Sequence, residues 1–244
     1  MKLLTTRPSF DIATSYLSGY GALLVEQATQ WGHIVTDLFK EQATTEKFET
    51  EIVNNDMFIG FGHGSKTRFI GHDMQTLLQD TVNPDAVSGK DTYLASCLTA
   101  VRLGPAMIEK GCPEFHGYQG DFVFVYHPDY YNQGKILEDP YAKAFFDSAL
   151  TTGYAMLLGK EPFTVYQETV DRYKYWWDWW KKQPDPMGDS ILTWLNWDRQ
   201  NFVTITPDGI RAMEASLPVL GLAIPVGAAA VALFLLSGSW KKLL

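Results

Sequence analysis

The chain has 244 residues, 46% of them hydrophobic, which is enough to bury the core of one large domain or two small ones. Its formal net charge of −8 argues against nucleic acid as a partner, because nucleic-acid-binding domains usually present a basic face. The two cysteines, Cys97 and Cys112, do not make a disulfide framework. No CxxC or other zinc-ligand spacing is present.

The first part of the chain alternates short apolar strand patterns with helical patterns. Residues 57–61 are apolar apart from one glycine and show no clean alternation, which is typical of a strand buried on both faces of a parallel sheet. The order strand, helix, strand, helix, strand predicts an α/β fold with a parallel, doubly wound sheet. The expected elements are strands at 10–14, 33–39 and 57–61 and helices at 16–31 and 44–54, with Thr45 as the N-cap of the second helix.

Two strands of this sheet end in residues that can do chemistry. His63-Gly64 follows the strand at 57–61, and Ser96-Cys97 follows a shorter apolar run at 93–95. Ligands of open α/β sheets bind beyond the carboxyl ends of the strands, so neighbouring strands would place His63 and Cys97 across one crevice. An imidazole in that position favours the thiolate of a cysteine nucleophile and later donates a proton to the leaving group.

Strand-His-Gly followed by strand-Ser-Cys, with helices between, resembles the caspase/gingipain-like cysteine peptidases of the caspase-hemoglobinase fold, over about residues 8–127. The resemblance implies that His63 is the general base and acid and Cys97 the nucleophile. It also implies that the backbone N–H groups of Gly64 and Cys97 form the oxyanion hole, with a peptide or protein as substrate and no cofactor. The sequence departs from the family at Leu98, where a small residue often follows the cysteine, and in a second His-Gly pair, His116-Gly117.

The middle of the chain is expected to complete the sheet and to supply a pocket. The patterns predict a loop or small hairpin at 64–71, helices at 74–80 and 99–110, a loop at 81–89 and strands at 114–118 and 122–126. A polar and aromatic loop at 127–134 follows at the same sheet edge. Asp121, His127 and Asp129 are candidate residues of a substrate pocket, in which a carboxylate would select a basic side chain.

From residue 136 the pattern becomes mainly helical and rich in tryptophan. Helices are predicted at 139–158, 161–182 and 190–199, followed by a strand at 202–206. Trp176, Trp177, Trp179 and Trp180 cannot all face one side of a helix, so they indicate either packing over the sheet or an interface with a membrane or a protein partner. The predicted division is a caspase-like sheet domain (1–135), a helical extension packed on it (136–212) and a tail (213–244).

The tail has the composition of a single-pass membrane anchor. Residues 217–236 are Leu, Val, Ala, Ile, Phe, Gly and Pro, long enough to cross a bilayer as one helix, with a kink expected at Pro225. A buried C-terminal helix is the alternative. Lys241 and Lys242 favour a cytoplasmic C-terminus, whereas a start without a signal-peptide core favours a cytoplasmic soluble domain, and the second interpretation is preferred.

Two functions of different class fit these patterns. The first is a membrane-anchored cysteine endopeptidase with a His63/Cys97 dyad. The second is a catalytically silent caspase-like structural or scaffold subunit of a membrane-associated or viral-type assembly, which Leu98 and the tryptophans suit. A flavodoxin-like small-molecule binder lacks a GxGxxG phosphate loop. Three local alternatives stay open: Cys97 as an ordinary core residue, His116 as the base, and a zinc site of His63, Cys97 and His116.

Overall fold

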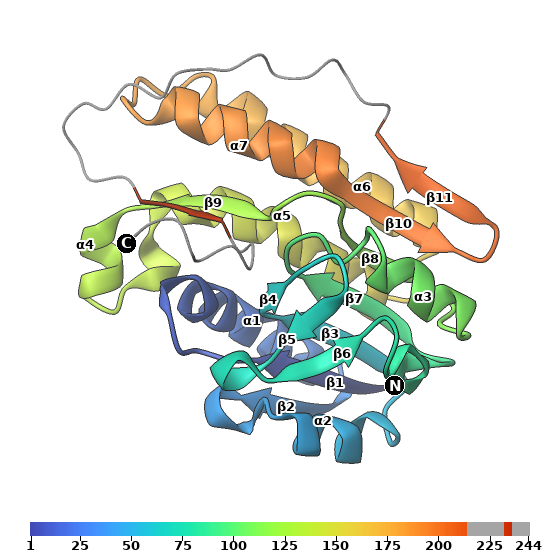
Figure 1. Ribbon diagram of the computed structural model, residues 1–244. Coiled ribbons are helices and arrows are strands. Elements are labelled where there is room, and N and C mark those ends of the chain that lie inside the picture. The colour runs from blue at the N-terminus through green and yellow to red at the C-terminus, as the bar shows by residue number, and fades with distance from the viewer. Residues whose placement is uncertain (214–231, 236–244) are drawn as a thin grey trace.

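The computed structural model describes residues 1–213 and 232–235, and it is built on one mixed sheet of seven strands in the order β11-β10-β8-β7-β3-β1-β2 (Figure 1). The five strands from β8 to β2 run parallel, whereas β10 and β11 join antiparallel at one edge. The strands are β1 Lys2–Arg7, β2 Ile34–Phe39, β3 Met57–Phe61, β7 Asp91–Ala95, β8 Phe115–Tyr118, β10 Phe202–Thr206 and β11 Gly209–Ala212.

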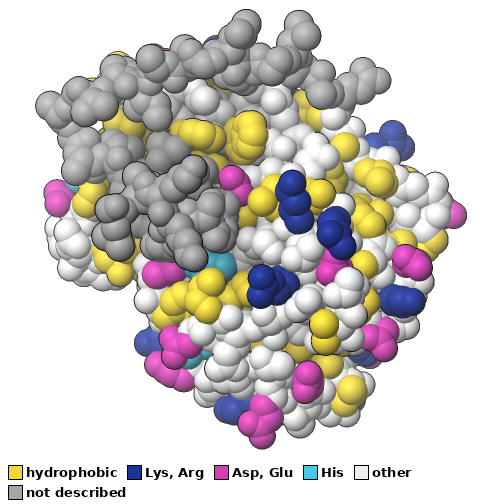
Figure 2. Space-filling model, in the orientation of Figure 1, with side chains coloured by type: hydrophobic (Ala, Val, Ile, Leu, Met, Phe, Trp, Pro, Cys, Tyr) yellow, Lys and Arg dark blue, Asp and Glu magenta, His cyan; other side chains and the backbone are white. Residues whose placement is uncertain are grey.

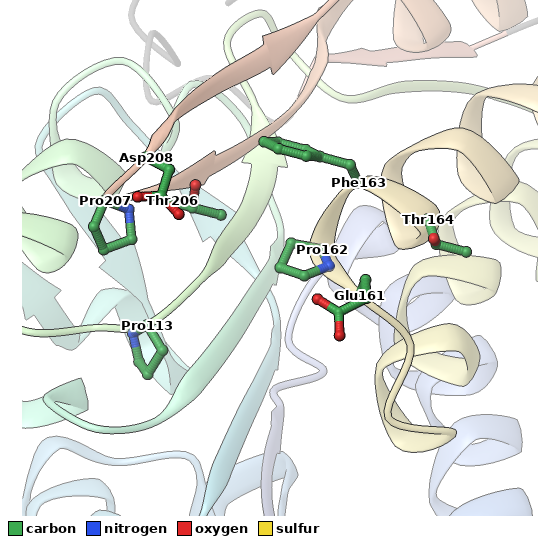
Figure 3. A pocket seen from close by; sticks show the side chains of 8 residues that line it. All are labelled: Pro113, Glu161, Pro162, Phe163, Thr164, Thr206, Pro207 and Asp208. Atoms are coloured by element: carbon green, nitrogen blue, oxygen red, sulfur yellow. The ribbon is translucent and has the colours of Figure 1, made fainter.

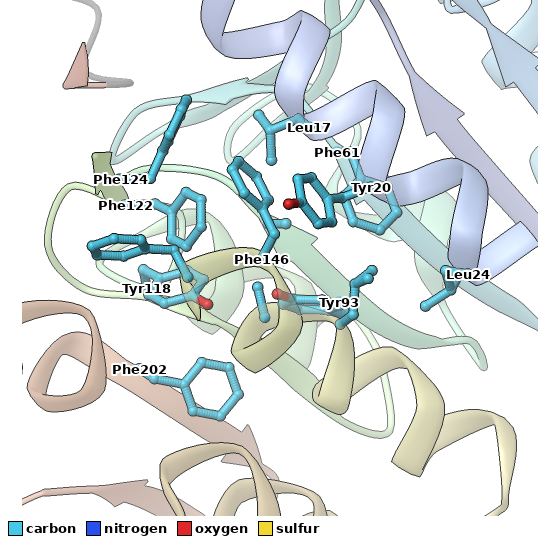
Figure 4. Close-up of a cluster of buried hydrophobic side chains, with 14 of the residues drawn as sticks. Leu17, Tyr20, Leu24, Phe61, Tyr93, Tyr118, Phe122, Phe124, Phe146 and Phe202 are labelled. Carbon is cyan, nitrogen blue, oxygen red and sulfur yellow. The ribbon is translucent and has the colours of Figure 1, made fainter. Parts of the chain in front are cut away.

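Helices cover both faces of this sheet, so the doubly wound α/β prediction is confirmed at the level of fold class. Alternate residues of each central strand enter opposite cores: Ile59 packs with α1 and α5, and Phe58 packs with α2 and α3. Figure 4 shows the aromatic centre of the first core, and Figure 1 shows α6 and α7 continuing that layer. The helices are α1 Ile12–Gln30, α2 Thr45–Ile52, α3 Leu103–Glu109, α4 Pro128–Asn132, α5 Pro140–Leu157, α6 Pro162–Trp180 and α7 Gly188–Asn201.

The first strand lies earlier than the sequence predicts. Residues 2–7 form β1, and the strand expected at 10–14 is wrong because that segment begins α1. Asp11 caps this helix: its carboxylate accepts from the Thr14 backbone, and the Thr14 hydroxyl accepts from the Asp11 backbone. The pattern hides β1 because its core positions include Thr5 and Thr6, polar residues that are fully buried in the sheet.

Three other expectations need correction. The helix expected at 74–80 is strand β6 Thr76–Gln79, which pairs with β5 Arg68–Ile70 and, through it, with β4 His63–Gly64. The loop expected at 127–134 contains α4, and the N-cap of α2 is Thr44 rather than Thr45. Short 3-10 turns occupy other loops: η1 Lys40–Gln42, η2 His72–Met74, η3 Pro84–Val87 and η4 Ile136–Glu138.

The helical part after residue 136 shares the core of the sheet. The buried faces of α5, α6 and α7 belong to the same apolar cluster as α1, β3 and β7, and β10 and β11 extend the sheet itself. The three helices begin and end close to where the sequence predicts them. The residues from 136 to 212 therefore complete the sheet and one of its two covering layers.

The predicted membrane span at 217–236 lies almost entirely outside the described residues. Four of its positions, Ala232–Leu235, form strand β12, which pairs antiparallel with β9 Val123–Tyr126 in a separate two-stranded sheet. No helix in the described part of the chain is both long and apolar enough to cross a membrane. The spanning helix therefore stays a prediction from the sequence.

Candidate functional site

The two predicted catalytic segments lie against each other at one edge of the sheet. Strands β3 and β7 are parallel neighbours whose last residues, Phe61 and Ala95, are paired. His63-Gly64 and Ser96-Cys97 therefore leave the sheet at the same edge. A Cβ on Gly64 would lie 2.5 Å from the carbonyl oxygen of Cys97 and 2.9 Å from the Ser96 hydroxyl, so only glycine allows this approach of the two backbones.

The His63 side chain is held by a carboxylate that the sequence reasoning missed. Its Nε2 atom lies 2.6 Å from Oδ2 of Asp11, and the His63 side chain is 5% exposed. The other oxygen of Asp11 accepts from the backbone N–H and hydroxyl of Thr14, so one residue caps α1 and orients the imidazole. The spacing Asp11-x-x-Thr14 is a capping signal that sequence analysis had available.

The charge state of Asp11 follows from these contacts. Burial by itself would raise the pKa of this carboxyl. The hydrogen bond and charge of His63, together with the Thr14 backbone and hydroxyl, outweigh burial and hold the pKa of Asp11 below its ordinary value. Asp11 is therefore ionised at neutral pH and suited to orient an imidazole that gains positive charge.

Cys97 is fully buried, and its sulfur bonds to the backbone of Phe122. Sγ accepts a hydrogen bond from the Phe122 N–H at 3.2 Å, and the thiol donates one to the Phe122 carbonyl oxygen at 3.7 Å. The Phe122 ring packs against Tyr118 and Phe146 in the same core (Figure 4). Burial, followed by the charge of Asp121, raises the pKa of the Cys97 thiol well above its ordinary value. In this conformation Cys97 is a protonated thiol.

The residue after the cysteine has a strained backbone. Leu98 has a φ of +60°, a left-handed conformation that costs a non-glycine residue about 1 to 2 kcal/mol. The same turn is closed by the Leu98 N–H, which donates to the Gly120 carbonyl at 2.9 Å. Leu98, which stands where a small residue often follows the cysteine in the caspase/gingipain-like family, therefore places backbone strain beside the sulfur. Such strain clusters at functional sites.

The three candidate pocket residues separate into two places. Asp121 lies next to Phe122 and close to Cys97, and burial raises the pKa of its carboxyl. His127 and Asp129 instead line a polar cavity of about 400 Å³ with Tyr130, Gln133, Lys135 and Glu138. His127 also caps α4, where its Nδ1 accepts from the Asp129 N–H at 3.2 Å. Neither His63 nor Cys97 lines this cavity.

His116 and Cys112 have contacts that explain them as parts of the core. His116 lies within β8, fully buried, with Nδ1 2.7 Å from the Thr204 hydroxyl. The Cys112 sulfur donates to the Glu114 carbonyl at 3.1 Å, and burial raises the pKa of this thiol to about 12. Among the described residues no group of three or more His, Cys, Asp or Glu side chains is arranged to hold a metal.

A second cavity lies away from the predicted site. It measures about 260 Å³ and lies near the start of β8, between the turn after β10 and the start of α6 (Figure 3). Since β7 and β8 are parallel, the start of β8 lies at the sheet edge opposite to Cys97. The residues that line this second cavity are Pro113, Glu161, Pro162, Phe163, Thr164, Thr206, Pro207 and Asp208.

The four clustered tryptophans differ in exposure. Trp180 is 4% exposed and belongs to the core, and the Trp176 indole N–H donates to Asp147 at 2.6 Å. Trp177 is covered by the Lys181 ammonium, which lies 4.5 Å from its ring centroid. Trp179 is 40% exposed, so the surface available to a partner is smaller than the sequence suggests.

Comparison with known proteins adds no family assignment. A scan against models of protein families gave no match, and a search of curated proteins gave none either. On the face drawn in Figure 2, basic and acidic side chains are interspersed. The residues of this chain, and the resemblance carried by their order, are therefore the basis for a proposed function.

Proposed function

We propose that the chain is a cysteine endopeptidase of the caspase/gingipain-like type. The observation that supports this most is the joint position of His63-Gly64 and Ser96-Cys97 at one sheet edge, with His63 oriented by the half-buried carboxylate of Asp11. A nucleophile, a base and a third group that orients the base are the recurring parts of covalent catalysis by cysteine or serine.

The proposed reaction follows from these roles. The thiol proton of Cys97 passes to His63, and the sulfur attacks the scissile carbonyl carbon, whose oxygen is held by the Gly64 and Cys97 amides. The C–N bond then breaks, and His63 donates its proton to the leaving amine. Water, deprotonated by His63, attacks the resulting thioester, and the sulfur leaves as a thiol with the proton that His63 returns.

The described conformation is an inactive one in this proposal. Cys97 is fully buried and bonded to Phe122, so substrate reaches the sulfur only after the segment around Phe122 moves. We further propose that residues 217–236 anchor the chain in a membrane, with the soluble part in the cytoplasm. The length and composition of the apolar run support the membrane anchor.

A peptide probe with a thiol-reactive group tests the peptidase. We expect labelling of the full chain to require Cys97 and to fall strongly in His63→Ala, while Cys112→Ala, which alters the other buried cysteine, labels like the parent. Labelling of Cys97 at the rate of free cysteine, independent of His63, would overturn the proposal. Flotation of the chain with lipid vesicles tests the anchor, and failure to float would refute it.

The second candidate is a catalytically silent scaffold of the same fold. The specific observation in its favour is the complete burial of the Cys97 thiol and the satisfaction of its hydrogen bonds by one backbone residue. Such a cysteine behaves as a small apolar core residue. The probe experiment separates the two functions, since a scaffold gives no labelling that depends on His63.

A further inference from the structure

Three consecutive residues beside the sulfur are each fixed by a different group. The carbonyl of Asp121 accepts from the Trp197 indole N–H at 2.8 Å. The N–H of Phe122 donates to the Cys97 sulfur at 3.2 Å, and the N–H of Val123 donates to Oδ1 of Asp198 at 3.0 Å. Two of these three contacts therefore come from adjacent residues of α7.

Asp198 is an unusual residue for such a position. Its side chain is fully buried, and its second oxygen, Oδ2, has no hydrogen-bond partner in the described structure. Burial raises the pKa of this carboxyl well above its ordinary value. Burying a carboxyl is unfavourable, and an apolar residue at this position would avoid that cost. The hydrogen bond to the Val123 N–H is the favourable contact that the Asp198 carboxyl makes in exchange.

Two side chains of α7 hold the segment 121–123, which contacts the Cys97 sulfur through the Phe122 N–H. The Phe122 N–H reaches the sulfur only while residues 121–123 keep their present path, and the residues on either side of Phe122 are bonded to α7. The Phe122 side chain adds buried aromatic packing to the same segment. Val123 is also the first residue of β9, where it is paired with Leu235 of β12, and α7 supplies the side-chain hydrogen bonds to Asp121 and Val123.

We propose that Trp197 and Asp198 are positioning residues that act on Cys97 through the segment 121–123. They hold the Phe122 amide on the sulfur and keep the thiol covered, and loosening them exposes it. The inference deepens the proposed peptidase, because it assigns to the helical part of the chain control over the nucleophile. Its physical content, the accessibility of the thiol, is independent of whether a peptide is cleaved.

The test measures alkylation of Cys97 by iodoacetamide in the full chain, resolved by mass spectrometry, with buried Cys112 as the internal reference. We expect Asp198→Ala and Trp197→Phe to raise the rate at Cys97 by about tenfold or more, because a buried thiol reacts only through local opening. Asp198→Asn should stay near the parent rate, since its amide oxygen still accepts from Val123. Hydrogen exchange at the Val123 amide should change in the same order.

The matched control is Ile191→Ala, a fully buried position of α7 remote in sequence from the contacts at 197 and 198. Global stability is measured for every variant. A higher Cys97 rate in Ile191→Ala equal to that of an equally destabilised Asp198→Ala would overturn the proposal, and so would an unchanged rate in Asp198→Ala. Iodoacetamide needs neither His63 nor a peptide, so failure of the peptidase leaves this result intact.

Discussion

The contact between Asp11 and His63 allows a quantitative prediction that separates two roles of one carboxylate. Asp11 caps α1 through Thr14 and binds the imidazole at 2.6 Å. Asparagine is as good an N-cap as aspartate, so Asp11→Asn removes the charge toward His63 and keeps the cap. Asp11→Ala removes both.

The expected costs follow from the two contacts. Loss of an N-cap costs about 1 kcal/mol, and a hydrogen bond to a charged group is worth about 1.5 to 3 kcal/mol. We therefore expect Asp11→Ala to lower the free energy of unfolding by about 2.5 to 4 kcal/mol. Asp11→Asn should lower it by about 1 to 2 kcal/mol, because a neutral hydrogen bond replaces a charged one.

The pH dependence has a definite sign. The pKa of Asp11 is lower in the folded chain than its ordinary value of 3.8, so the folded state binds fewer protons than the unfolded state around that pH. The stabilisation is fully present above pH 3.8 and is lost as the pH falls through the lower folded pKa. The cost of Asp11→Asn should therefore be full at pH 6 and shrink below pH 3.8.

Urea denaturation followed by tryptophan fluorescence measures these free energies. A double-mutant cycle with His63→Gln gives the coupling between the two side chains, and we expect it to exceed about 0.5 kcal/mol at pH 6, the usual limit of additivity. Additive effects of the two substitutions would refute the assignment of Asp11 as the residue that orients His63.

Three further predictions concern other residues. Asp91→Asn should raise stability relative to the parent at pH 8 but not at pH 4 in urea titrations, because burial, then the charge of Glu114, raises the pKa of Asp91 to about 6 and its ionisation above that pH opposes folding. Asp139→Ala should cost about 3 to 5 kcal/mol in the same assay, since it leaves four buried or part-buried donors without their acceptor. Gly64→Ala should cost about 1 to 3 kcal/mol through its clash with Cys97. Gly188→Ala should not destabilise, because the new Cβ would lie 3.9 Å from the Gln183 carbonyl oxygen, an ordinary contact distance.

The sequence was most informative where apolar pattern and turn residues agreed. Helix α5 was expected from residue 139 and begins at Pro140, a residue suited to a first helical turn, with the Asp139 side chain as its cap. Strand β3 is buried at every position, as expected from a run that is apolar apart from Gly60 and shows no alternation. The predictions failed at β1 and β6, where polar residues are buried or a short apolar run fits either period.

The contacts of the site residues were harder to predict from the sequence, because the residues that bind each other are distant in the chain. Asp11 and His63 are 52 positions apart, and Asp198 and Val123 are 75 apart. Local patterns carry no information about which strand ends meet or which helix covers them. The sequence pattern around Asp11 indicates only a helix cap. The pattern around Asp198 indicates only an acidic residue within a helix.

The sequence alone determined the alternation of strands and helices in most of the sheet and the three helices after residue 136. It also determined the two chemical dipeptides, His63-Gly64 and Ser96-Cys97, and the apolar run at 217–236. Tertiary structure decided that the two dipeptides meet, that Asp11 holds the imidazole, and that α7 fixes the segment covering the sulfur. The reason is physical: strand and helix periods act over a few residues. The ionisation and accessibility of a side chain depend instead on whatever the completed fold packs against it.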